Sequence, residues 1–152
     1  MKAGDLKRFP LLVEFDEEDR NGLSDLLEPL SLSEGETVFR EGDEADALYL
    51  VVRGRIRISS ANCGALGTLS NGSSLGAVSL MTIGSREASA CAESDCDLLV
   101  LTRADFRRLA VDVPRTACRL AEAVVAQLAA GLRPNLDRIE REFSSAEDNA
   151  DG

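Results

Sequence analysis

The residue whose chemistry stands out in this sequence is an arginine that follows a glycine by ten positions. Arg86 lies near the end of LGAVSLMTIGSREASA and Gly76 near its start. A planar guanidinium matches two oxygens of a phosphate or carboxylate, and the first backbone N–H groups of a short helix add further donors. The stretch therefore has the parts of an anion site. An arginine in a surface turn would also fit the pattern, and the carboxylate of Glu87 opposes a bound anion.

Other reactive patterns in the sequence are incomplete. GSSLG, residues 72–76, has the G-x-S-x-G spacing of serine hydrolases, but the chain has no histidine to accept the proton of Ser74. The same lack excludes a haem site with an axial histidine. The four cysteines contain no CxxC pair, so we expect isolated reduced thiols that serve in packing. We therefore expect neither an enzyme nor a metal site.

The charge balance argues against a polyanionic partner. Seventeen basic and twenty-seven acidic residues give a formal net charge of −10, which repels DNA and RNA at long range. The apolar runs fall far short of the roughly 20 residues that span a bilayer, and the N-terminus lacks the core of a signal peptide. We expect a cytoplasmic protein without a nucleic-acid or membrane partner.

The first two thirds of the chain predict one helix followed by short strands. Asp16 can cap a helix that presents Leu23, Leu26 and Leu27 on one face and ends at Pro29. Runs with period-2 alternation then recur between turn signals, and the runs on either side of Gly54 predict a hairpin. With roughly eight such strands, the sequence predicts a closed or double-sheet β architecture.

The composition then changes to that of helices. Thr102 with Asp105 resembles a capping box, Pro114 suits the first turn of a longer helix, and Pro134 is expected to break or end it. The long helix carries an apolar stripe at helical spacing, made of Ala117, Leu120, Ala121, Val124, Val125, Leu128 and Leu132. Part of the stripe can pack on the β domain. We expect a homodimer interface through Leu120, Val124 and Leu128, with full burial of the stripe within one chain as the alternative. Residues 1–132 then form the domain, and residues 133–152 a short helix and a flexible acidic tail.

The order of these signals resembles the cyclic-nucleotide-binding domain of catabolite-activator-type regulators and of the protein kinase A regulatory subunit. The resemblance spans roughly residues 9–132. It is carried by EGETVFREGDEADALYLVVRGRIRI, NGSSLGAVSLMTIGSREASA and LLVLTRADFRRL. It implies a mainly β fold with flanking α-helices, namely a β-roll or jelly roll of about eight strands with an N-terminal helix and C-terminal helices.

The resemblance also implies a phosphate-binding cassette at residues 76–86. In the family the arginine pairs with the cyclic phosphate, and a glutamate after the glycine binds the ribose 2′-hydroxyl. In this chain Ala77 stands in the place of that glutamate, and Glu87 stands in the place of a small residue. The candidate ligand-binding residues are Gly76, Ala77, Val78, Ser79, Leu80, Arg86 and Glu87, with the backbone N–H groups of Val78, Ser79 and Leu80 as donors.

Two interpretations of function follow. The first is a non-enzymatic, stand-alone regulatory module that acts through an unknown protein partner and has reduced or lost cyclic-mononucleotide binding. The alternative is a genuine sensor that binds a cyclic nucleotide or another anionic ligand through Arg86, and no other cofactor is implied. Only twenty residues follow Leu132, which we expect to be too few for a DNA-binding helix-turn-helix domain.

Overall fold

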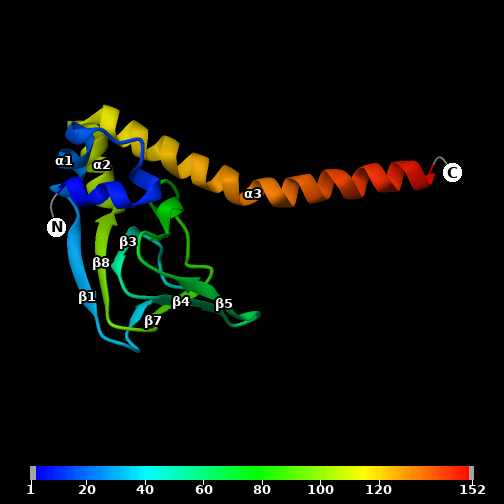
Figure 1. The fold of residues 1–152 in the computed structure, drawn as a ribbon, viewed down its shortest axis with the longest axis horizontal. Coiled ribbons are helices and arrows are strands. Elements are labelled where there is room, and N and C mark those ends of the chain that lie inside the picture. The colour runs from blue at the N-terminus through cyan, green and yellow to red at the C-terminus, as the bar shows by residue number, and fades with distance from the viewer. Residues whose placement is uncertain (1–2, 151–152) are drawn as a thin grey trace.

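A computed structural model of the chain describes residues 3–150, with side chains at all of these positions except 3, 133, 135–137 and 145–150. Short helices at the N-terminus precede a β domain, and two helices follow it (Figure 1). The helical elements are η1 (Ala3–Arg8), η2 (Pro10–Leu12), α1 (Glu17–Ser24), η3 (Ala77–Leu80), α2 (Arg103–Asp112) and α3 (Pro114–Ala150). The strands are β1 (Glu28–Leu32), β2 (Thr37–Phe39), β3 (Ala47–Arg53), β4 (Ile56–Ser60), β5 (Gly64–Leu69), β6 (Ser74–Leu75), β7 (Ser89–Ala92) and β8 (Cys96–Thr102).

The eight strands form two antiparallel sheets of four strands each, which confirms the predicted double-sheet, jelly-roll-like fold. One sheet has the order β1-β8-β3-β6 and the other the order β2-β7-β4-β5. A small core contains buried residues of both sheets, among them Val51, Ile56, Ala90 and Leu98. In β4, Ile56 is buried in this core and Arg57 is exposed, as the period-2 pattern predicts.

The hairpin predicted at Gly54 is wrong. Strand β3 pairs with β6 and β8, whereas β4 pairs with β5 and β7, so the chain passes from one sheet to the other at Gly54. Gly54 has a φ of +103°, and a Cβ there would lie 2.5 Å from the carbonyl oxygen of Asp95. Alternation shows which face of a strand is buried but not which strand is its partner, so the sequence pattern could not distinguish a hairpin from this crossing.

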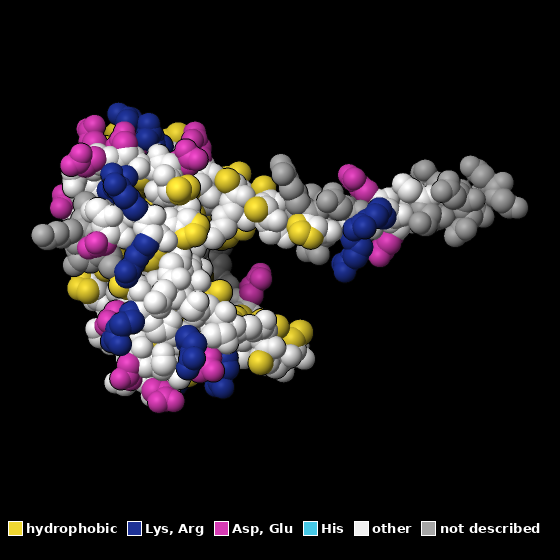
Figure 2. Space-filling model, in the orientation of Figure 1, with side chains coloured by type: hydrophobic (Ala, Val, Ile, Leu, Met, Phe, Trp, Pro, Cys, Tyr) yellow, Lys and Arg dark blue, Asp and Glu magenta, His cyan; other side chains and the backbone are white. Residues whose placement is uncertain are grey.

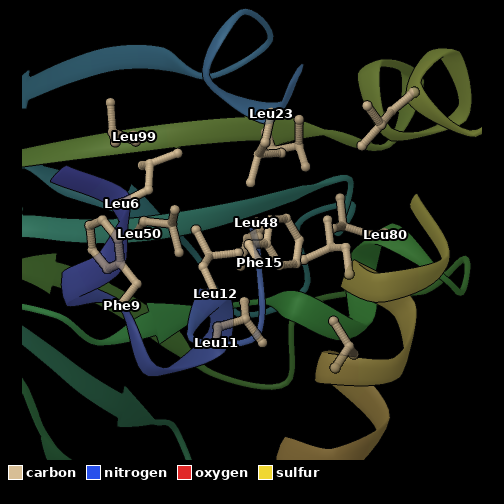
Figure 3. Packing of buried hydrophobic residues seen from close by; sticks show 14 of the residues in the cluster. Leu6, Phe9, Leu11, Leu12, Phe15, Leu23, Leu48, Leu50, Leu80 and Leu99 are labelled. Carbon is tan, nitrogen blue, oxygen red and sulfur yellow. The ribbon is translucent and has the colours of Figure 1, made fainter. Parts of the chain in front are cut away.

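A larger core lies between the first sheet and the helices (Figure 3). Leu48 and Leu50 of β3 contribute its sheet side, and Leu6, Phe9 and Leu12 of the N-terminal segment pack against them. Leu80 of η3, Leu109 of α2 and Leu120 of α3 belong to the same cluster. The cassette helix and both C-terminal helices therefore share one hydrophobic core.

The C-terminal helix corrects two predictions. Leu120 and Val124 are 0% and 1% exposed in the larger core, so they do not form a free contact surface, whereas Leu128 is 44% exposed. The helix also continues through Pro134 as a single element, α3. A proline removes one hydrogen bond and crowds the preceding turn, but the residues on either side can still keep helical geometry. Among the described residues, no helix is both long and apolar enough to span a membrane.

The predicted caps are present. The Asp16 carboxylate accepts from the backbone N–H of Asp19 at 2.8 Å, and Thr102 accepts from the backbone N–H of Asp105 at 3.1 Å. Helix α1 ends at Ser24, before the predicted end, and Pro29 lies in β1. Strand β1 pairs only with β8 and is therefore an edge strand, where a residue without an N–H is tolerated.

A buried carboxylate joins α1 to α3. Asp19 is 1% exposed, and it accepts from the Thr116 hydroxyl at 2.6 Å and from Arg119 Nη1 at 2.7 Å. The backbone N–H of Asp16 donates to the same carboxylate at 3.2 Å. Buried charges are stable only when they are paired and hydrogen-bonded, as Asp19 is here. This contact fixes the start of α3 against the N-terminal helix.

Replacing Asp19 with asparagine should lower the free energy of unfolding by about 2 to 4 kcal/mol, because the buried anion that holds Thr116 and Arg119 is lost. Urea denaturation at neutral pH measures the change. Asp97→Asn is the matched control, because Asp97 pairs with Arg53 at 2.8 Å on the surface and exposed pairs contribute little. Equal losses from the two variants would contradict a special role for Asp19.

The same contact predicts acid sensitivity. Burial raises the pKa of Asp19, but hydrogen bonds from Thr116 and from the Asp16 N–H, with the charges of Arg119 and Arg115, bring the pKa below its ordinary 3.8. The folded state therefore binds fewer protons than the unfolded state in this range. The contribution of Asp19 is complete above the ordinary pKa and is lost as pH falls through the lower folded value. The free energy of unfolding, measured by denaturation from about pH 6 to pH 2, should fall less steeply with decreasing pH in Asp19→Asn than in the parent.

Candidate functional site

The candidate site begins at a glycine that turns the chain from β6 into η3. Gly76 has a φ of +74°, in the left-handed region, and a Cβ there would lie 2.2 Å from Arg86 Nη1 and 2.9 Å from the Ala47 carbonyl oxygen. Glycine is the residue that adopts this conformation without strain and allows so close an approach. The turn therefore depends on glycine both for its backbone angle and for the space that Arg86 occupies.

Arg86 is 7% exposed and is held by three elements. Its Nη1 donates to the Ser79 hydroxyl at 3.0 Å, and its Nη2 donates to the Ala47 carbonyl at 2.9 Å. The guanidinium carbon lies 4.2 Å from the ring centroid of Phe39 and 5.6 Å from that of Tyr49. These contacts fix the plane of the guanidinium, because one face lies on an aromatic ring and two nitrogens are bound to oxygen.

The charge of Arg86 is not neutralised by a carboxylate in the described part of the chain. None of the ion pairs formed there includes Arg86, and its buried Nε has no hydrogen-bond partner. Burial lowers the pKa of Arg86, and the nearby Tyr49 and Asp46 act in the opposite direction. A desolvated cation with an unused donor is costly, so this position favours a bound anion.

A cavity of about 650 Å³ opens beside the guanidinium. Its walls come from both sheets and from the cassette, and include Phe39, Ile58, Leu69 and Leu75. This volume lies within the range of small-molecule sites, which are typically apolar clefts with a few placed polar groups. Arg86 is the one basic residue in the described lining, so it is the group that would orient an anionic ligand.

The cavity brings together most of the predicted ligand-binding residues. Gly76, Val78, Ser79, Arg86 and Glu87 line it. Glu87 is exposed and makes no ion pair with Arg86 among the described residues, so its carboxylate adds negative charge at the site. The prediction that the glycine and the arginine ten residues apart meet at one cavity agrees with this geometry.

Two predicted residues do not line the cavity. Ala77 packs against the larger core, and Leu80 is 3% exposed within it. The cassette helix is a 3₁₀-helix, in which residues three apart lie on the same side, so 77 and 80 face the core together. The backbone N–H of Ser79 is likewise used within the turn, where it donates to the Gly76 carbonyl at 2.9 Å. It is therefore not free for an anion as predicted.

Sequence reasoning missed three residues that shape the site. Phe39 and Tyr49 lie on different strands far from the cassette in sequence and supply the aromatic contacts to Arg86. Arg103 begins α2, and it donates through Nε to the Ser79 carbonyl at 2.9 Å, through Nη2 to the Thr82 carbonyl at 2.9 Å, and also to the Ala45 carbonyl. An arginine in the first turn of a helix opposes the helix dipole, and this was the available signal that it serves another purpose.

The two four-stranded sheets and the helical turn between β6 and β7 define a β-roll domain of the cyclic-nucleotide-binding type. The chain belongs to the cyclic nucleotide-binding domain family, whose model matches residues 29–112. It is 36% identical over 99 residues to the cyclic AMP receptor protein of Thermus thermophilus, and the matched region covers 62% of this chain and 46% of that protein. It is 32% identical over 110 residues to the cAMP-dependent protein kinase regulatory subunit of Yarrowia lipolytica, with 72% of this chain and 29% of that protein covered.

The solved structures agree with this assignment. The N-terminal domain of a transcriptional regulator from Streptomyces coelicolor A3(2) is 29% identical and superposes with a TM-score of 0.74, over 84% of this chain and 94% of that chain. The chain thus spans less than half the length of these two curated relatives but nearly the whole of that solved domain. The predicted family and fold are confirmed.

Replacing Gly76 with alanine should destabilise the fold and displace Arg86. The left-handed backbone alone costs an alanine about 1 to 2 kcal/mol, and the new methyl group would collide with Arg86 Nη1 and the Ala47 carbonyl. Urea denaturation reports the loss of stability, and the chemical shift of the Arg86 side-chain N–H signals reports the displacement.

Gly84→Ala is the matched control for this substitution. Gly84 also lines the cavity, but a Cβ there meets nothing within 4 Å. We expect that variant to retain the stability and the Arg86 signals of the parent. If Gly76→Ala were equally well tolerated, the close approach between Gly76 and Arg86 would be wrong.

Proposed function

We propose that this chain is a non-enzymatic regulatory module that binds a small organic anion beside Arg86 and transmits the bound state through α3. The observation that carries the proposal is a buried guanidinium that lines a cavity, has no ion-pair partner among the described residues and has a buried Nε without a hydrogen bond. An anion would supply the missing counter-charge, and a low-dielectric site strengthens that attraction. The family to which the chain belongs supports a regulatory role.

Within this proposal, binding of ordinary cyclic mononucleotides is reduced. Ala77 offers no carboxylate for a ribose hydroxyl, and a lost hydrogen bond to a charged group costs about 1.5 to 3 kcal/mol. Glu87 adds a like charge at the lining, and a carboxylate about 5 Å from an anion costs about 3 kcal/mol at an effective dielectric constant of 20. The anion site is retained, but two features that favour a sugar phosphate are absent.

The contacts of η3 suggest how the bound state would reach α3. Arg103 of α2 donates hydrogen bonds to the carbonyls of Ser79 and Thr82. A shift of the cassette would therefore displace α2 or break these bonds. Leu80 and Leu120 share the larger core, and Gln127 of α3 donates to Ser74 of β6 at 3.1 Å. A ligand shifts such an equilibrium only by binding the two arrangements with different affinity.

The outer part of α3 is the proposed contact surface. We call it the α3 apolar face. Its described members are 43% to 68% exposed, and they are Val125, Leu128, Leu132, Ile139 and Phe143. Figures 1 and 2 show that this part of α3 extends away from the β domain and carries hydrophobic side chains. Val125, Leu132 and Ile139 recur every seven residues and so lie along one side of the helix, which favours pairing with a second helix. We propose a homodimer through this face, which an unknown protein partner could also use.

Arg86→Gln should abolish anion binding or weaken it at least about tenfold, because a bidentate charged contact is lost. Isothermal calorimetry with cAMP, cGMP and cyclic dinucleotides measures this, preceded by mass spectrometry of small molecules released from the purified protein. Arg57→Gln, on the exposed side of β4, is the control and should bind like the parent. Unchanged binding by Arg86→Gln would place the ligand elsewhere.

Leu132→Glu should shift the protein from dimer to monomer, because two copies would bring buried carboxylates together in the interface. Sedimentation velocity measures the mass in solution. Leu66→Glu is a matched control, because Leu66 is 54% exposed and Leu132 is 55% exposed, but Leu66 lies on β5. A parent protein that is monomeric, or a Leu132→Glu variant that stays dimeric, would refute the proposed interface.

A further inference from the structure

The cavity beside Arg86 has a composition that restricts its ligand further, provided that the proposed anion site is correct. Eight of its fifteen lining residues are apolar, and the charged ones are Arg86 and Glu87. The apolar walls come from four strands, with Phe39 on β2, Ile58 on β4, Leu69 on β5 and Leu75 on β6. The ligand should therefore have one charged end and an apolar body, whose transfer from water into the cavity is favourable.

The lining has few polar side chains, and two of its hydroxyls already make one hydrogen bond each within the protein. The Ser79 hydroxyl accepts from Arg86 Nη1 at 3.0 Å, and the Thr82 hydroxyl donates to the Val78 carbonyl at 3.2 Å. Ser85 is the remaining hydroxyl-bearing residue in the lining. A sugar in this cavity would place several hydroxyls beside mostly apolar walls, and each hydroxyl that is buried without a partner weakens binding.

The charge of the lining sets the charge of the ligand. One guanidinium can neutralise one negative charge, and the carboxylate of Glu87 opposes every bound anion but opposes a dianion more strongly than a monoanion. One face of the Arg86 guanidinium lies against Phe39, and Nη1 and Nη2 each donate one of their N–H groups to the protein. Because Arg86 lines the cavity, we expect a ligand to meet the remaining N–H groups at the edge of the guanidinium. A planar, singly charged group such as a carboxylate fits this arrangement.

We infer that the ligand of this pocket is an organic monoanion with an apolar body that lacks sugar hydroxyls, such as an aromatic or medium-chain carboxylate. Its charged group meets the edge of Arg86, and its body lies against Leu69, Leu75 and Ile58. Glu87 acts as the selectivity residue that discriminates against dianions, including phosphate monoesters.

Calorimetry with matched probes tests this inference. The probes are 3-phenylpropionate and octanoate, their neutral primary amides, phenyl phosphate as a dianion with an apolar body, and cAMP as a monoanion with a sugar. We expect at least one of the two carboxylates to bind at least about tenfold more tightly than its amide, than phenyl phosphate and than cAMP. Arg86→Gln should remove the preference for carboxylate over amide.

Two further variants separate the roles of wall and charge. Leu69→Gln should weaken carboxylate binding at least about fivefold, whereas Leu66→Gln, on the same strand but outside the cavity, should not. Glu87→Gln should strengthen the binding of phenyl phosphate about tenfold or more and that of the carboxylates by less. The reason is that Glu87 repels a dianion more strongly than a monoanion, so its removal favours the dianion more. Circular dichroism of each variant confirms that it is folded.

The outcomes distinguish this inference from the proposed function. Arg86-dependent binding of cAMP or phenyl phosphate that equals or exceeds carboxylate binding would overturn the ligand class and leave the anion site standing. Equal binding of carboxylates and amides, or failure of both carboxylates while another anion binds, would also overturn it. If no anion produces Arg86-dependent heat, both the ligand class and the proposed function are wrong.

Discussion

The site depends on one constraint, the accommodation of a buried guanidinium. Arg86 is 7% exposed, and its charge is balanced by the Ala47 carbonyl, the Ser79 hydroxyl and the face of Phe39 in place of a carboxylate. These partners come from β3, η3 and β2, so the two sheets and the cassette must keep their relative positions for the cation to remain solvated by protein dipoles. The absence of a side chain at Gly76 leaves the space in which this occurs.

The cassette is also part of the main hydrophobic core, which gives the site its connection to the helices. Leu80 packs in the cluster that contains Leu109 of α2 and Leu120 of α3. Arg103 adds a polar link, because it starts α2 and donates to carbonyls at the end of η3. A close-packed core with fixed polar links does not deform continuously, so a displaced cassette requires the helices to repack. At its start, α3 is held to α1 by the buried carboxylate of Asp19.

The chain combines a family architecture with a changed set of polar groups. The cation of the cassette and the glycine beside it are present, and they meet at the cavity. Ala77 faces the core, and Glu87 introduces a carboxylate at the lining. Since hydrogen bonds and charges set specificity more than apolar area does, these two positions are the basis of our proposal that cyclic-mononucleotide binding is reduced.

The sequence by itself determined the local features: the alternation of Ile56 and Ile58 with Arg57 in β4, the caps at Asp16 and Thr102, and the ten-residue spacing from Gly76 to Arg86. These depend on neighbours within a few residues or on strand and helix periods. Only the tertiary structure decided that β3 and β4 belong to different sheets, and that Leu120 and Val124 are covered while Leu132 is exposed. It also decided that Phe39 lies against Arg86. A periodic pattern states which residues share a face, but what covers that face depends on contacts between residues far apart in the chain.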